Sequence, residues 1–370
     1  MQNAFDSFCH ATLLSKLNEL GVQKTSLKWF QSYLLNRNQF VEISHVIQNR
    51  IVKHRSAMKK IKMGVPQGST LGPLLFLCYI NGLNRCLKYS PQSSLCLYAD
   101  DCNLRVSGKT ESEVEIKSLV EVGAIEQFFN DHSILINPEK TNIVSFQTKQ
   151  CKQGIKPNIK ICNKNIYTTE KTKFLGLIID KNLSWDDHVM CVLKKINAGL
   201  YALRIMSRLC SQHVLKQIYY SHVHSHISYG ICIYGATNNQ NLYEILKTQK
   251  TAIRIMFKLE AKESVRDLFK ELGILTVYGL YIFQCIVYAK LNKAEPTNIQ
   301  QHSYNTRNKN DVKFEKHRLE LFKKKTQYAG NKFIKILPKN IKEENNFVWF
   351  QRKLKKHLIK LAPYKLEDFV

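Results

Sequence analysis

LCLYADDCNLRV, residues 95–106, sets two adjacent carboxylates between two short apolar runs. The runs are typical of β-strands, and the pattern predicts a hairpin with Asp100 and Asp101 at its tip. Like charges held side by side favour a bound cation, and hard carboxylate oxygens suit Mg²⁺ or Mn²⁺. The alternative is an ordinary hairpin turn, because aspartate is favoured in turns. The hairpin alone leaves both interpretations open.

A second stretch upstream, GVPQGSTLGPLLF at residues 64–76, decides between them. Together the two stretches resemble the reverse transcriptase of non-LTR retrotransposons, of the kind found in insect jockey-like elements. GVPQGS followed by LGPLLF is similar to that family's template-and-nucleotide loop, and YADD is similar to its metal-binding hairpin. Both occur in the family's order, so the resemblance favours a metal site over a simple turn.

The resemblance extends along the chain. AFD at residues 4–6 is similar to the end of the family's first catalytic motif, and INPEKTN at residues 136–142 is similar to its LN..KT motif. FLGLIID with LSWDDH, residues 174–180 and 183–188, is similar to its FLG…D..L.W..H pattern.

These matches imply roles for single residues. Asp100 and Asp101 are the expected catalytic and metal-binding carboxylates, and Lys140 is a candidate cation near the leaving pyrophosphate or, alternatively, a solvated lysine after a turn. The residues expected to contact nucleotide or template are Phe5, Gly64, Pro66, Gln67 and Gly68. The residues expected to form a primer grip are Phe174, Leu175 and Gly176. The implied cofactor is Mg²⁺, with Mn²⁺ as a substitute, and the implied partners are an RNA template, a DNA primer or target, and deoxynucleotides.

The charge agrees with a nucleic-acid partner. Lys and Arg number 56 against 29 Asp and Glu among 370 residues, a formal charge of +27, which is typical of proteins that bind a polyanion. The stretch from Leu35 to Lys62 has seven positive residues against Glu42 alone, and we expect a basic loop there. Residues 149–173 predict a basic β-hairpin that turns at residues 163–165.

Other properties exclude some classes of protein. The longest apolar runs, residues 72–80 and 280–289, are far shorter than the roughly 20 residues that span a bilayer, so we expect no membrane partner. The eleven cysteines form no C-x-x-C pair and the N-terminus has no signal peptide. We therefore expect reduced thiols and an intracellular protein, in the nucleus or cytoplasm, and not a secreted one. His222 and His226 would share a helix face while His224 points away, which disfavours a zinc site.

Periodicity predicts the elements. Helical patterns cover residues 11–20, 26–33, 112–130, 189–259, 271–291 and 347–361, and strand patterns cover 37–43 and 143–146. We predict an α+β fold: a polymerase palm of antiparallel sheet with helices on one face, then an α-helical thumb and a basic helical region. The expected domains are a partial palm at 1–188, the thumb or connection at 189–295, a polar linker at 296–310 and the basic C-terminal region at 311–370.

The implied reaction is RNA-directed DNA synthesis by two-metal nucleotidyl transfer. The resemblance places the family's first metal-binding aspartate one position before Met1. We therefore expect an N-terminally truncated polymerase, lacking fingers and the first catalytic strand, that does not synthesise DNA by itself. The alternative is a non-catalytic nucleic-acid-binding remnant of a retroelement.

Overall fold

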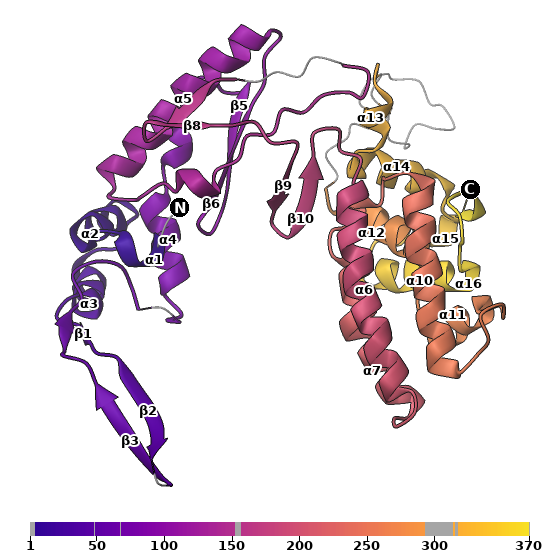
Figure 1. Ribbon diagram of the computed structural model, residues 1–370. Coiled ribbons are helices and arrows are strands. Elements are labelled where there is room, and N and C mark those ends of the chain that lie inside the picture. Colours follow the sequence, from indigo (N-terminus) through magenta and orange to yellow (C-terminus); the bar gives the residue numbers. More distant parts are fainter. Residues whose placement is uncertain are drawn as a thin grey trace. The chain divides into compact units, whose positions relative to one another are not determined.

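The computed structural model describes residues 4–47, 49–66, 68–151, 157–292, 314 and 317–369. The chain forms two compact units, residues 1–170 and residues 171–370 (Figure 1). Each is treated by itself below. Residues 296–310, predicted to be a linker, lie outside the described residues, and so does Gln67.

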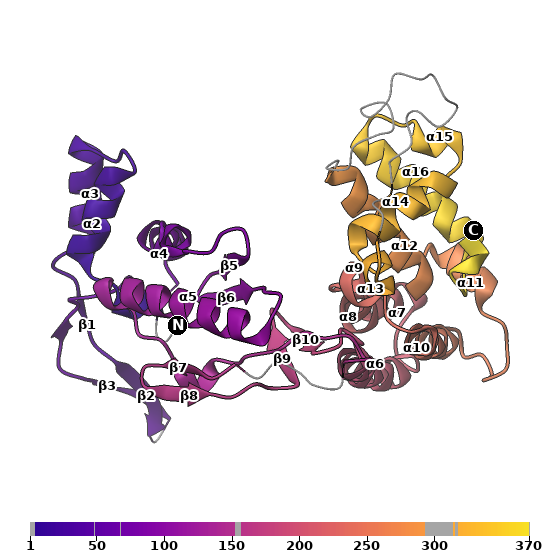
Figure 2. The ribbon, with the colours of Figure 1, turned by 90° about the horizontal axis from the view of Figure 1, so that it is seen from above.

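The first unit mixes short helices with β-hairpins (Figure 2). Its helices are α1 (Ala4–Ser7), α2 (His10–Glu19), α3 (Lys24–Leu34), α4 (Gly72–Ile80), the 3₁₀ turns η1 (Leu83–Cys86) and η2 (Pro138–Lys140), and α5 (Glu111–Asp131). Its strands are β1 (Asn38–Gln39), β2 (Glu42–Ile47), β3 (Arg50–Arg55), β4 (Lys59–Lys60), β5 (Ser93–Tyr98), β6 (Asp101–Val106), β7 (Ile159–Ile161) and β8 (Lys164–Ile166).

The core of this unit forms where α2 packs on α4. Helix α4 has the sequence GPLLFLCYI, and proline in its first turn suits a helix start because the missing N–H would have had no partner there. Its Phe76 and Tyr79 are buried beside Phe8, whose ring centroid lies 5.0 Å from that of Tyr79. Leu13 and Leu17 of α2 complete the contact. The GVPQGS loop therefore leads directly into the best-packed helix of the unit.

All named strands of the described residues pair antiparallel, as five two-stranded sheets. The antiparallel pairing was predicted, but the strands form separate hairpins. The prediction of a strand at residues 143–146 is wrong, because only Ile143 forms a β-bridge there, with Thr168. The β7–β8 hairpin was predicted, but its turn is Cys162-Asn163, both at positive φ, one residue earlier than expected. Within residues 35–62, expected as a basic loop after a strand at 37–43, residues 42–47 and 50–55 form the β2–β3 ribbon.

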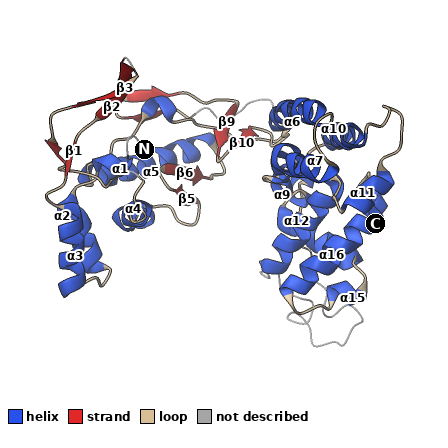
Figure 3. Ribbon diagram, turned by 90° about the horizontal axis from the view of Figure 1, so that it is seen from below, coloured by secondary structure: helices blue, strands red, loops and turns tan. Residues whose placement is uncertain are grey.

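The second unit is mainly helical (Figure 3). It begins with the hairpin β9 (Lys171–Phe174) and β10 (Leu177–Asp180). Its helices are α6 (Asp186–Met206), α7 (Gln212–Tyr219), the π-helical turn η3 (Tyr220–His224), α8 (Ser225–Ser228), α9 (Ile231–Tyr234), α10 (Asn239–Phe257), α11 (Arg266–Leu272), α12 (Val277–Leu291), α13 (Glu320–Lys323), α14 (Thr326–Ile336), α15 (Lys339–Lys342), α16 (Phe347–Leu361) and the 3₁₀ turn η5 (Glu367–Phe369).

One continuous core holds this unit together around α12, which is buried along most of its length. That burial explains the apolar run at 280–289 as core. Among the described residues no single helix is long and apolar enough to span a membrane. Helices α11 and α12, which are bent relative to each other, together have the length and apolar composition of a membrane span. Helix α16 has the predicted bounds, Phe347–Leu361, and buries Phe350, Leu354 and Leu358.

The division between the units follows Glu170, whereas the sequence placed the end of the palm at residue 188. The reason is local: β9–β10 packs on helices of the second unit, with Leu177 in that unit's core. The predicted palm, thumb and C-terminal boundaries stay predictions.

Candidate active site

The β5–β6 hairpin carries the two aspartates. Its register pairs Leu97 with Cys102 and Tyr98 with Asp101, so Ala99 and Asp100 form a two-residue turn. Side chains alternate along the strands: Leu95, Leu97, Cys102 and Leu104 pack on the core, and the face with Tyr98 and Asp101 is exposed. Burial raises the pKa of the Cys102 thiol to about 11. The period-two pattern thus separates the core-facing side from the side that carries Asp101.

The turn itself places the carboxylates. Ala99 has φ 48°, the left-handed conformation that a tight two-residue hairpin turn requires. Asp100 is half-buried in the turn and Asp101, the first residue of β6, is exposed. One or two carboxylates hold Mg²⁺ in nucleotide-processing sites, with water and substrate phosphates completing its shell. The residues present fit a divalent ion in that role.

No group of three or more His, Cys, Asp or Glu side chains that could hold a metal is found in the described ranges. His222, His224 and His226 are therefore in no such group among the described residues. His224 is instead largely buried beside the rings of Tyr219 and Tyr220, and burial lowers its pKa to about 4.

Helix α5 braces the base of the hairpin. Glu121 is fully buried, and its carboxylate accepts N–H hydrogen bonds from Lys88 at 2.9 Å and Tyr89 at 2.7 Å. One turn earlier, Lys117 lies 2.6 Å from Glu113 and donates to the carbonyl of Ser107, just after β6. The loop before β5 and the end of β6 are thus both tied to one helix face. Sequence reasoning missed this brace, although charges at 113, 117 and 121 share a helix face.

The GVPQGS loop closes on α1. The N–H groups of Gly64 and Val65 donate to the carbonyls of Phe8 and Phe5, both at 2.9 Å. Gly64 has φ +72°, and a Cβ there would lie 2.5 Å from the Asp6 Cα and from the Phe5 carbonyl oxygen. Only glycine fits this approach. Gly68 also has positive φ, +80°, but faces open space.

Phe5 is thereby brought together with Gly64 and its loop, and its ring lies 5.1 Å from that of Phe76. Pro66 accepts the N–H of Ser69 at 3.2 Å, as part of the turn that leads to α4. These contacts give Phe5, Gly64 and Pro66 a role in the fold. Their expected contacts with nucleotide or template stay predictions.

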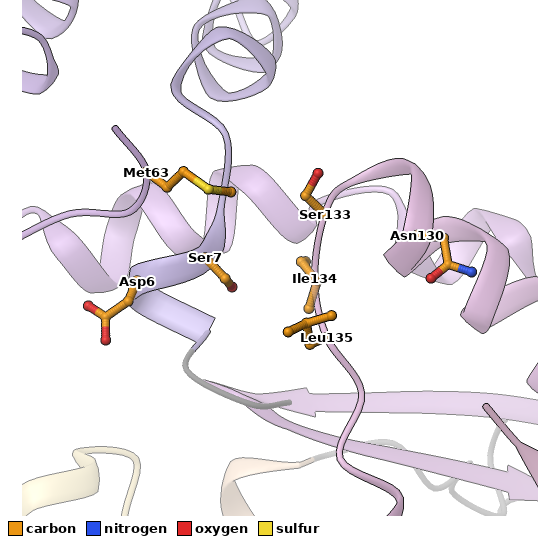
Figure 4. Close-up of a pocket in the computed structure, with 7 residues that line it drawn as sticks. All are labelled: Asp6, Ser7, Met63, Asn130, Ser133, Ile134 and Leu135. Atoms are coloured by element: carbon orange, nitrogen blue, oxygen red, sulfur yellow. The ribbon is translucent and has the colours of Figure 1, made fainter. Parts of the chain in front are cut away.

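A shallow pocket of about 470 Å³ lies beside this loop. It is lined by Asp6, Ser7, Met63, Asn130, Ser133, Ile134 and Leu135 (Figure 4). Figure 4 shows the Asp6 carboxylate directed away from Ile134 and Leu135. The pocket therefore lies between the end of α1 and the segment after α5.

Lys140 is exposed at the end of a short turn. The side-chain oxygen of Asn137 accepts the N–H groups of Glu139 and Lys140, at 3.1 and 3.3 Å, and Glu139 pairs with Lys164 at 2.8 Å. The turn holds the Lys140 backbone while its side chain extends into solvent. Its proposed role at the leaving group stays a prediction.

The predicted primer grip lies in the second unit. Phe174 ends β9, and Leu175 and Gly176, at φ +45° and +81°, form the two-residue turn before β10. The hydroxyl of Tyr229 donates to the carbonyl of Leu175, and the Tyr229 ring packs on Gly176. Tyr229 was missed by sequence reasoning, since nothing in its own segment signals a contact so distant along the chain.

The D..L.W..H part of the resemblance has a structural explanation. The Asp180 carboxylate accepts N–H hydrogen bonds from Asn182, Ser184 and Trp185 at 3.0–3.2 Å. Partial burial acts to raise the pKa of Asp180, but these donors outweigh it and leave the pKa below its ordinary value. Trp185 and His188 are buried behind this turn, so the motif fixes the join between β10 and α6.

Comparisons with known proteins agree with the family resemblance of the β5–β6 hairpin and the GVPQGS loop. The family model described as "Reverse transcriptase (RNA-dependent DNA polymerase)" matches residues 1–179. The chain is 27% identical over 290 residues to the "Probable RNA-directed DNA polymerase from transposon BS" of Drosophila melanogaster, covering 75% of this chain and 30% of that protein.

Two further relatives from Drosophila melanogaster give similar values. They are the "RNA-directed DNA polymerase from mobile element jockey", 23% identical with 74% of this chain and 29% of the relative covered, and the "Probable RNA-directed DNA polymerase from transposon X-element", 24% identical with 75% and 30% covered. The chain thus spans about a third of the length of these relatives. Residues 1–179 match the reverse transcriptase family model, and about three quarters of the chain is similar to the RNA-directed DNA polymerases of Drosophila mobile elements such as jockey.

Proposed function

We propose that this chain provides the metal-binding hairpin, the template loop and the primer grip of an RNA-directed DNA polymerase. The observation that carries the proposal is the β5–β6 turn, which exposes Asp101 and half-exposes Asp100 on a hairpin braced by Glu121. In this proposal the first unit is the palm and the helices of the second unit are the thumb.

Asp100 and Asp101 would hold Mg²⁺ or Mn²⁺, with Asp100 as the first ligand. Bound divalent ions supply charge neutralisation at the attacking 3′-oxygen and the leaving pyrophosphate. The chain's own residues contact the substrates. The backbone of the loop from Gly64 to Gly68 faces the template and the nucleotide, and Phe5 lies under the sugar. Lys140 provides a positive charge near the leaving group. The Leu175-Gly176 turn supports the primer end. RNA template, DNA primer and deoxynucleotides are the proposed partners.

The metal site has a test that needs no catalysis. When hydrogen peroxide and ascorbate are added, Fe²⁺ bound in place of Mg²⁺ reduces the peroxide to hydroxide and a hydroxyl radical, which cuts the backbone near the ion, and ascorbate returns the Fe³⁺ to Fe²⁺. We expect cleavage within β5–β6 in the wild-type chain and its loss in the Asp100→Asn, Asp101→Asn double variant. An Asp186→Asn, Asp187→Asn variant, which changes an adjacent aspartate pair at the start of α6, is the matched control. Cleavage that survives in the hairpin double variant would refute the metal assignment.

Primer extension on an RNA template tests the activity. Incorporation of nucleotides that Asp100→Ala abolishes would support the polymerase. The second candidate function, non-catalytic binding of nucleic acid, is favoured by the formal charge of +27. It predicts salt-sensitive RNA binding that Asp100→Ala does not weaken, together with no metal-directed cleavage.

A further inference from the structure

The β2–β3 ribbon extends away from the helices of the first unit (Figure 1). Its strands pair from Glu42 with Arg55 to Ile47 with Arg50, and a short second ladder, β1 with β4, lies at its base. We call residues 38–60 the arm. Nearly all described residues of the arm are exposed on both faces of the ribbon. A two-stranded ribbon of this kind is marginally stable in water by itself, so the arm is a candidate for a binding surface.

The arm is strongly basic. Its one acidic residue, Glu42, lies 2.8 Å from Lys53 and 2.6 Å from Arg55, and these hydrogen bonds lower the Glu42 pKa. The Glu42 carboxylate is therefore paired with cations of the ribbon itself. The remaining cations of the arm are Arg50 near the tip and Lys59 and Lys60 at the base. The arm therefore presents net positive charge at both ends, and its complement is a polyanion.

The tip is apolar as well as basic. Val46 and Ile51 are directly opposite each other and are 68% and 71% exposed, and Ile47 is opposite Arg50. Single strands are usually bound by exposed aromatic rings on which bases stack. The aromatic side chains of the arm lie away from its tip: His45 and His54 stack on each other at 4.9 Å, and Arg55 covers the Phe40 ring. Aliphatic side chains beside cations instead suit the major groove of a DNA duplex, where apolar groups can contact thymine methyl groups.

We propose that the arm binds a DNA duplex, with Arg50, Lys59 and Lys60 on phosphates and the Val46, Ile47 and Ile51 side chains in the major groove. The dimensions agree, because the major groove of B-form DNA admits a two-stranded β-ribbon. The inference rests on the proposed function only in sharing its partner, nucleic acid. It adds a binding surface that lies outside the hairpin, loop and grip.

The test is equilibrium binding of a fluorescent DNA duplex at several salt concentrations. Each phosphate contact contributes about 0.9 to the slope of log K against log salt. The Arg50→Gln, Lys59→Gln, Lys60→Gln variant should reduce that slope by about 2 to 3 and weaken binding about tenfold or more at low salt. The control removes the same charge elsewhere, as Lys247→Gln, Lys262→Gln, Lys270→Gln, and should change the slope by less than about 1.

Two further variants isolate the arm. Replacing residues 43–54 by Asn-Gly keeps the Glu42 and Arg55 ends and the β1–β4 ladder, and should reproduce the loss of duplex affinity. Ile47→Ser, Ile51→Ser should weaken binding while leaving the salt slope unchanged. Circular dichroism confirms that each variant is folded.

The outcomes separate the two proposals. If the charge variant and the shortened chain both bind the duplex as tightly as the wild-type chain, with the same salt slope, the arm is not the binding surface. The polymerase proposal is unaffected by that result. An equal loss for single-stranded RNA overturns the duplex as the partner. Absence of any binding to duplex or RNA by the wild-type chain refutes the proposed function itself.

Discussion

The hydroxyl of Tyr229 donates a 2.5 Å hydrogen bond to the carbonyl oxygen of Leu175, 54 residues earlier in the chain. Leu175 and Gly176 form the turn of the β9–β10 hairpin, and a Cβ added to Gly176 would lie 3.2 Å from the Tyr229 ring. The predicted primer grip is therefore held by the helical segment of its own unit, so its position depends on how residues 225–231 fold.

Tyr229→Phe removes this hydrogen bond but keeps the ring. We expect it to lower the free energy of unfolding by about 1 kcal/mol and to speed amide exchange at the grip turn. Urea unfolding and hydrogen exchange measure the two effects. Tyr243→Phe, at an exposed tyrosine of α10, is the control. Equal effects in both variants would show that the Leu175 contact contributes nothing.

Gly64→Ala tests the close approach of the GVPQGS loop to α1. Left-handed φ costs about 1–2 kcal/mol for a residue with a side chain, and the clash with Asp6 and Phe5 adds about 1–3 kcal/mol. Gly68→Ala has the same positive φ but no neighbour within 4 Å, and should cost only the first amount. Denaturant unfolding compares them; similar losses would contradict the packing argument.

Glu121→Ala tests the brace of the metal hairpin. The change leaves the N–H groups of Lys88 and Tyr89 without their carboxylate, and we expect a loss of about 3 kcal/mol. Amide exchange in β5 should accelerate, and iron-directed cleavage at the Asp100 turn should weaken. Glu121→Gln, which keeps one acceptor oxygen, should fall between wild type and the alanine variant. Unaltered exchange in β5 would mean that the hairpin does not need this brace.

His224 should make the stability of the second unit depend on pH. Burial, with a smaller contribution from Lys355, lowers its pKa from 6.5 to about 4, and its Nδ1 has no hydrogen-bond partner among the described residues. Below pH 6.5 the unfolded chain binds a proton that the folded chain binds only near pH 4. Stability is therefore full above pH 6.5 and falls as pH decreases toward 4, by on the order of 3 kcal/mol.

His224→Phe should remove that dependence, which urea unfolding between pH 7 and pH 4 measures. The nearby rings of Tyr219 and Tyr220, whose pKa values are raised by burial, stay neutral throughout this range. A variant whose stability still falls as steeply over this interval would assign the dependence to other groups.

The sequence predicted what depends on local pattern. The two short apolar runs at residues 95–106 were sufficient for the β5–β6 hairpin, and the three- and four-residue spacing of Phe347, Phe350 and Leu354 for α16. Contacts between distant segments were not predictable, because the hydrogen bonds of Glu121 with Lys88 and of Tyr229 with Leu175 exist only after the chain folds. The β2–β3 ribbon was missed for another reason: neither of its faces is buried, so the sequences of β2 and β3 do not alternate between apolar and polar residues.

The two faces of the β5–β6 hairpin also sort its thiols. Cys96 is on the exposed face with Tyr98 and Asp101, whereas Cys102 faces the core with a raised pKa. A thiolate is the reactive form of cysteine, so an alkylating dye should label Cys96 and spare Cys102. With the exposed Cys151 and Cys162 replaced by serine, such a dye would report by its fluorescence when a metal ion or a nucleic acid reaches the aspartates.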